Sequence, residues 1–351
     1  MVAKVICGRY VGGSGLGPLN DTMSLVQRYA QTLSELSGKD FQGEVCARFQ
    51  AVILSFQSIP SNPHGDAGLD GFSHDGEHGY CCYGPEHDAF KKPKDREKAI
   101  VKKFASDLRR LFELDFKSKK LIQITNAEMA TILPTGRSLK HIKLLVNWFD
   151  SHRILNPISD AVAEYKAASA CKYVDPSASV VVMGPKELAS WYAVDEATIL
   201  RATQVNLLKQ VTAEAATVTI DNATDFDAKM DLLLQIKPSQ AQAIAEMKKR
   251  FLEDWRMALA FARNIDGRLP THHFALEQHR ARILQKVAQL MIESEKCWAE
   301  LGRANEIATV VLAPDFNSFG TSLLETISSG EIARLIGECP IGWELPGGND
   351  A

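Results

Sequence analysis

The feature that most restricts the fold is a pair of β-prone runs joined by a short polar turn in the first third of the chain. The runs Leu69–Ser73 and Gly79–Tyr83 flank the dipeptide Asp75-Gly76, which is typical of tight hairpin turns. A basic helical pattern follows at Asp95–Leu114, and the apolar run Lys120–Thr125 then predicts a buried strand. Strands that alternate with helices in this way predict an α/β domain.

The segments on either side of this stretch extend the same alternation. Before it, apolar residues at helical spacing predict two helices, Thr22–Leu36 and Lys39–Phe56. After it, we expect a helix at Leu139–Phe149 and short strands at Arg153–Leu155 and Ser179–Met183.

Beyond about residue 195 the pattern changes to helices. Long helical patterns at Ser239–Asn264 and Thr271–Leu301 are separated by Asp266-Gly267 and Pro270, which predicts an antiparallel helical hairpin. Shorter helices are expected at Glu196–Ala216 and Ser322–Ile336. We therefore divide the chain into a flexible arm (residues 1–20), an α/β domain (21–155), an extension from α/β to helical structure (156–230) and a helical-hairpin domain (231–351).

Length and composition place the chain among ordinary globular proteins. Its 351 residues exceed what one hydrophobic core usually serves, and 45% of them are hydrophobic while 24% are charged. Apolar runs are far shorter than the roughly 20 residues that a membrane helix needs, so we expect no membrane association. The seven cysteines are an odd number, and most are scattered, which indicates reduced thiols and a cytoplasmic location.

Positive charge is concentrated between Lys91 and Lys120, although the whole chain has a net charge of -3. This segment holds twelve Lys and Arg residues against five acids, a net charge of +7. A local excess of this size can hold a phosphate backbone, and a solvated helix face is the alternative. The expected nucleic-acid-binding residues are Lys91, Lys92, Lys94, Lys103 and Arg109.

The hairpin itself carries a recognisable motif. The segments GDAGLDGF (Gly65–Phe72) and YCCYGPE (Tyr80–Glu86) resemble the GDxGxDG…YQxYxPE pattern of restriction-endonuclease-like proteins. These proteins form the PD-(D/E)xK superfamily, and the similar branch contains Mrr-type enzymes and nuclease subunits of bacterial anti-phage systems. The resemblance covers about residues 39–125, and it implies a restriction-endonuclease-like fold for the α/β domain.

The resemblance also implies a metal site. It identifies Asp70 as a ligand of Mg²⁺ or Mn²⁺, with Glu44 on the preceding helix in support. The family's second strand usually supplies Glu or Gln, one residue, and then Lys, whereas this chain has Cys81-Cys82-Tyr83. Glu86 and the following helix could replace the missing groups. The expected catalytic residues are Asp70, Glu86, Lys98 and Lys102, and the expected metal ligands are Asp70, Glu44, Glu86 and Asp66.

Zinc is a competing interpretation of the same stretch. His74, His78 and Cys81 have spacings that suit tetrahedral coordination by nitrogen and sulfur. Adjacent cysteines on one strand point to opposite faces, however, so only one of Cys81 and Cys82 could join such a site. A surface hairpin with titrating histidines and buried thiols is the simpler alternative.

The function that follows is a metal-dependent phosphodiesterase, an endonuclease with DNA preferred over RNA as its substrate, acting as an effector in a bacterial defence or restriction-type system. The alternative is a catalytically degenerate nuclease-fold subunit that binds nucleic acid or a partner protein. In either case the helical hairpin could dock a protein partner. We also expect a homo-oligomer, because nucleases of this type often act as dimers in which each site cuts one strand.

Overall fold

The computed structural model describes most of the chain. The described residues are 23–59, 68–73, 75–86, 89–118, 120–133, 136–149, 152–191, 193–236, 238–293 and 301–338. The N-terminal arm, Asp66 and His74 lie outside them. The described residues form two compact units, Met23–Ala202 and the part from Thr203 onward, so the boundary falls within the helix α7 (Glu196–Ala215). The predicted boundaries at residues 155 and 230 each fall inside one of these units.

The first unit is built on a mixed five-stranded sheet of order β1-β2-β3-β6-β7. Its first three strands are antiparallel, and β6 and β7 then continue parallel to β3. The α/β class predicted from the sequence is therefore confirmed. The strands are β1 (Phe56–Ser58), β2 (Gly71–Ser73), β3 (His78–Tyr83), β6 (Leu139–Val146) and β7 (Val174–Met183).

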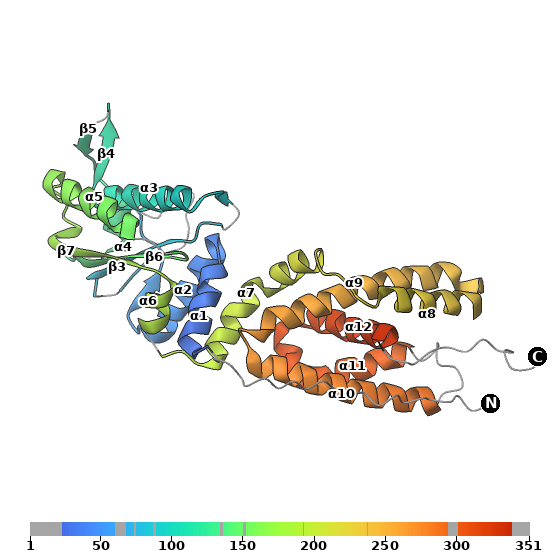
Figure 1. Ribbon diagram of the computed structural model, residues 1–351. Helices are drawn as coiled ribbons and strands as arrows, with labels where there is room; N and C mark the ends of the chain where they lie inside the picture. The colour runs from blue at the N-terminus through green and yellow to red at the C-terminus, as the bar shows by residue number, and fades with distance from the viewer. Residues whose placement is uncertain are drawn as a thin grey trace, which may run out of the picture. The chain divides into compact units, whose positions relative to one another are not determined.

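Helices cover both faces of this sheet (Figure 1). On one side lie α1 (Leu25–Glu35), α2 (Gly38–Val52) and α6 (Pro185–Trp191), and on the other lie α3 (Pro93–Leu111) and α5 (Leu155–Ala168). The core between α3 and the sheet is formed by Ile100, Phe104 and Leu108 packed with Leu144 and other strand residues. A short helix α4 (Ala127–Ile132) precedes β6.

The strands β4 (Leu114–Lys117) and β5 (Lys120–Gln123) form a separate two-stranded sheet. In Figure 1 this ribbon projects beyond α3 and α5. The prediction of a buried strand at Lys120–Thr125 is therefore half right: a strand is present, but most of its side chains are exposed.

Two further predictions in this unit are wrong. The expected helix at Leu139–Phe149 is the strand β6, and the expected strand at Arg153–Leu155 is a 3-10 turn that leads into α5. In β6 the apolar residues Leu139, Ile142 and Val146 have helical spacing, but Ile142, Leu144 and Val146 also alternate as a strand requires. Five of the eight residues of β6 are apolar and fit both spacings, and such a run does not distinguish helix from strand.

The second unit is helical. The two long helices predicted there are present as α9 (Ala241–Asp266) and α10 (Pro270–Glu293), joined by a short turn. The helix α12 (Thr321–Glu338) packs against α9, α8 (Ala223–Ile236) and α11 (Leu301–Phe316). Their shared core includes Trp255, Phe226 and Ile327. No helix of the described residues is long and apolar enough to cross a membrane.

Candidate functional site

Asp70, the central residue of the predicted site, lies directly before β2 and is only 8% exposed. Its carboxylate accepts two hydrogen bonds. The Gln42 side-chain amide on α2 donates to Oδ1 at 2.6 Å, and the backbone N–H of Cys82 on β3 donates to Oδ2 at 2.5 Å. Both oxygens of the predicted metal ligand are therefore bound by donors of the protein.

The backbone N–H and carbonyl of Asp70 are also hydrogen-bonded. Its N–H donates to the carbonyl of Tyr80, and its own carbonyl accepts from the N–H of Ile59. Gly68, two residues earlier, has φ of +87°, and a Cβ there would lie 2.7 Å from the carbonyl oxygen of Asp107 on α3. The glycine lets the chain pass this close to the helix, which explains why glycine stands here in the motif.

Glu44 lies on α2 with only 3% exposure, but its partners are not those of a metal ligand. The Tyr29 hydroxyl donates to Oε1 at 2.9 Å, and the Arg201 guanidinium donates to the same oxygen at 2.9 Å. Burial and the adjacent Glu44 carboxylate raise the pKa of Tyr29, so this phenol stays protonated as a donor. The arrangement connects α1, α2 and the second turn of α7, and the contacts of Glu44 are structural.

These contacts predict that Glu44→Gln destabilises the protein by about 1–2 kcal/mol, because a hydrogen bond to a charged group contributes more than one to a neutral group. The loss should be the same with and without Mg²⁺ in a urea unfolding titration. Exposed Glu128→Gln on α4 is the control and should leave the unfolding midpoint nearly unchanged. A Mg²⁺-dependent stabilisation of the wild type that Glu44→Gln abolishes would contradict the structural role.

The other predicted ligands do not join Asp70 and Glu44. Glu86 is exposed after the Gly84-Pro85 end of β3, and Asp66 lies outside the described residues. Across the described ranges, no three His, Cys, Asp or Glu side chains gather in a way that could hold a metal ion. The described residues therefore do not fit the expected Mg²⁺ or Mn²⁺ centre.

The structure also does not bring the expected zinc ligands His78 and Cys81 together. His78 and Cys81 are three residues apart on β3, so the pleat points them to opposite faces of the sheet. The His78 ring stacks on that of His141 with the centroids 4.7 Å apart, whereas the Cys81 thiol is fully buried and donates to the carbonyl of Gly68 at 3.0 Å. His74, the third expected ligand, lies outside the described residues.

In the pattern that this stretch resembles, Cys81 stands at the position of Glu or Gln, Tyr83 stands at the position of Lys, and Cys82 lies between them. Beside the N–H that binds Asp70, the Cys82 thiol contacts the Cys46 thiol of α2. This contact lowers the pKa of Cys46, although burial acts in the opposite direction, and it raises the pKa of Cys82 together with burial. A packed pair of thiols, Cys46 and Cys82, therefore lies next to Asp70, and the lysine of the pattern is replaced by Tyr83.

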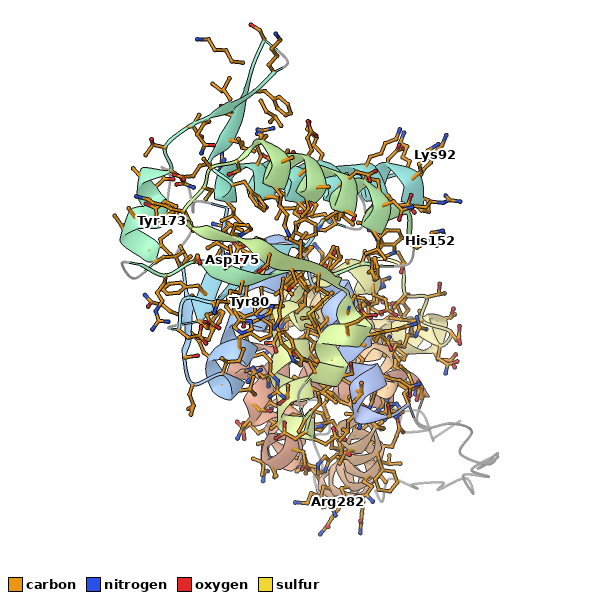
Figure 2. The ribbon with its side chains drawn as sticks, turned by 90° about the vertical axis from the view of Figure 1, so that its left-hand side faces the viewer. Tyr80, Lys92, His152, Tyr173, Asp175 and Arg282 are labelled. Carbon is orange, nitrogen blue, oxygen red and sulfur yellow. The ribbon has the colours of Figure 1, made fainter. Side chains whose placement is uncertain are left out.

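The helix α3 carries most of the predicted basic residues. Lys94, Lys98 and Lys102 are exposed at four-residue spacing, and the exposed Arg110 follows eight residues after Lys102; all four lie outside the buried face of the helix and are called the α3 row below. Lys91 and Lys92 are exposed at its start, where Figure 2 labels Lys92. The expected catalytic residues Lys98 and Lys102 thus belong to this outward row.

Two of the predicted nucleic-acid-binding residues have partners within the protein. The Lys103 ammonium lies 2.6 Å from both carboxylate oxygens of Asp107. The Arg109 guanidinium lies over the Phe116 ring, 4.8 Å from its centroid, and its Nε is 3.5 Å from a carboxylate oxygen of Asp115. Lys103 therefore supports α3 itself, and Arg109 connects α3 to the β4–β5 ribbon.

Sequence reasoning missed one unusual lysine. Lys143 on β6 places its ammonium 3.5 Å from the ring centroid of Trp191 and 5.4 Å from that of Tyr80. Burial lowers its pKa to about 8. The sequence pattern was interpreted as a helix, so the alternation that places His141 and Lys143 on one face of the sheet was not recognised. The contact with Trp191 could not be predicted either, because Trp191 lies 48 residues further along the chain.

Comparison of the chain with protein-family models finds no match, and comparisons with curated proteins and with solved structures find none either. What is established is therefore a class: a mixed α/β unit with helices on both sheet faces, followed by a helical unit. The motif around Asp70, the row of cations on α3 and their geometry are the basis for a functional proposal.

Proposed function

We propose that the unit Met23–Ala202 is a nucleic-acid-binding module of a nuclease-like protein, and that it binds DNA through the exposed row Lys94, Lys98, Lys102 and Arg110 of α3. The observation that carries the proposal is the row itself. None of these four side chains has an ion pair among those formed by the described residues.

The spacing of the row suits a phosphate backbone. Residues four apart on a helix are about 6 Å apart along its axis, so the three lysines span about 12 Å, and Arg110 lies about 12 Å further along the helix. Like charges at this spacing destabilise an isolated helix by a few tenths of a kcal/mol per pair. A row that costs stability and has no internal partner is best explained by an external polyanion, because phosphate contacts release the counterions bound to nucleic acid.

The test is the salt dependence of duplex DNA binding, measured by fluorescence anisotropy. We expect Lys98→Gln with Lys102→Gln to weaken binding on the order of 100-fold at 0.1 M salt and to reduce the slope of log K against log salt by about 2, since each phosphate contact contributes about 0.9.

The matched control is Lys39→Gln with Lys186→Gln, which removes the same charge from α2 and α6 on the opposite side of the sheet. This control should bind within about twofold of the wild type. Equal losses for both double variants would mean that the protein attracts DNA only through its overall charge, and an unchanged affinity for the α3 variant would reject the proposal.

The second candidate is the metal-dependent nuclease that the motif implies. The observation in its favour is that Asp70 stands between α2 and β3, in the order of helix, hairpin, basic helix and further strand that the motif requires. Cleavage assays of plasmid and single-stranded DNA with Mg²⁺ and Mn²⁺, wild type beside Asp70→Asn, separate the candidates. Cleavage that Asp70→Asn abolishes while binding persists would establish the nuclease. Binding without cleavage would favour the binding module.

The remaining expectations stay predictions. They are a role as an effector in a defence system, a protein partner for the helical part of the chain and a homo-oligomeric state.

A further inference from the structure

The β4–β5 ribbon contributes little to the core of the first unit: Leu114 lies in it and Leu121 packs against it. It forms its own sheet, and the pairs Asp115–Ile122, Phe116–Leu121 and Lys117–Lys120 lie directly opposite one another. Only Leu114, at its base, is buried. Figures 1 and 2 both show the ribbon extending past α3 and α5.

Its composition is unfavourable for a ribbon in water. An isolated two-stranded sheet is marginally stable at best, and like charges directly opposite each other destabilise it further. At the outer end Lys117 faces Lys120, and both are exposed. Phe116 and Ile122 are 48% and 39% exposed. Because they belong to neighbouring cross-strand pairs, they point to opposite faces of the ribbon, so each face carries a partly exposed apolar side chain.

The ribbon is nevertheless held in a definite place. Arg109 of α3 stacks on Phe116 and pairs with Asp115. The N–H of Ile124 donates to the carbonyl of Glu113 at 2.8 Å and closes the base. The ribbon therefore begins where α3 ends, and it adds two exposed lysines, Lys117 and Lys120, to the positive charge of the α3 row.

We propose that this ribbon, Leu114–Gln123, enters the major groove of double-helical DNA while the α3 row contacts the neighbouring backbone. The inference rests on the proposed function and deepens it, because it specifies a duplex rather than a single strand. Two strands about 4.8 Å apart fit a major groove about 12 Å wide. Lys117 and Lys120 contact the phosphates at the groove edges, and Phe116 and Ile122 are covered by the groove walls.

The experiment compares one sequence as duplex and as single strand at the same low salt. The variant is Lys117→Gln with Lys120→Gln, which removes two charges at exposed positions, and a thermal melt verifies that it is folded. We expect at least a tenfold loss of affinity for the duplex and less than a twofold change for the single strand. The Lys98→Gln, Lys102→Gln variant should instead weaken both.

A second readout tests the groove directly. Methylation of guanine N7, which lies in the major groove, should interfere with binding of the wild type and have less effect on the ribbon variant. Failure of the wild type to bind any DNA at low salt would overturn the proposed function itself. Binding by the wild type with an unchanged or equally reduced affinity of the ribbon variant for duplex and single strand would overturn only the role of the ribbon.

Discussion

Glu331→Gln is expected to destabilise the helical unit by about 3–5 kcal/mol, because the substitution removes the buried carboxylate between two largely buried guanidinium groups and leaves them only the more exposed carboxylates of Glu277 and Glu338. Glu331 lies on α12 and is 1% exposed. Its carboxylate accepts from Nε and Nη2 of Arg280 on α10 at 2.9 and 2.8 Å, and from Nε of Arg334 at 2.8 Å. Both arginine side chains are 16% exposed.

Urea unfolding of the full chain, followed by circular dichroism, measures this loss. The control is Glu338→Gln, which removes the second partner of Arg334 at a position where the carboxylate is 37% exposed. Exposed ion pairs contribute about 0–1 kcal/mol, so this variant should resemble the wild type. If Glu331→Gln and Glu338→Gln lowered the free energy of unfolding by similar amounts, the burial of the Glu331 carboxylate would not explain its contribution to stability.

The same contacts determine how the stability difference between the wild type and Glu331→Gln depends on pH. Burial alone would raise the pKa of Glu331, but the guanidinium groups of Arg280 and Arg334 outweigh it and hold the pKa below its usual value. The unfolded chain therefore takes up this proton at a higher pH than the folded chain. The stabilisation is fully present above the usual pKa of about 4.3 and is lost as the pH falls through the lower folded value. The gap between wild type and Glu331→Gln should shrink in that acidic range.

The cluster around Glu331 also shows what a single sequence can and cannot indicate. The helices α9 and α10 were predictable because Gly267 and Pro270 mark the break between long amphipathic runs. The burial of Glu331 was not, since its partner Arg280 stands 51 residues earlier and no local pattern connects them. The same holds for Glu44, whose position on α2 was predicted but whose partner Arg201 is 157 residues away.

Around Asp70, too, the local elements could be predicted from the sequence, whereas the contacts between them could not. The hairpin β2–β3 and the helix α3 follow from turn chemistry and apolar spacing, which are local properties. The occupation of the Asp70 carboxylate by Gln42 and Cys82 depends on how α2 packs on the sheet. The motif therefore located a buried acid correctly, whereas its chemical state required the tertiary contacts.

The second large effect is expected from Gly330→Ala in the middle of α12. On helix propensity alone, alanine should stabilise this position by about 1 kcal/mol. The helix α12 packs so closely on α9 here that an added Cβ would overlap the carbonyl oxygen of Asp254 and lie 2.6 Å from the Cβ of Ala258. Neither group is the end of a flexible side chain, so the helices themselves have to separate. Overpacking of this kind costs about 1–3 kcal/mol, and with backbone atoms in contact we take the upper end.

The packing cost therefore exceeds the propensity gain, and a net loss of about 2 kcal/mol is expected for Gly330→Ala. The matched variant is Gly302→Ala in α11, where an added Cβ has no heavy atom within 4 Å. With only the propensity gain acting, Gly302→Ala should be neutral or stabilising by up to about 1 kcal/mol. The two changes are chemically identical, so opposite signs in one urea titration would isolate the α9–α12 contact as the cause. Stabilisation by both would mean that the helices can separate at little cost.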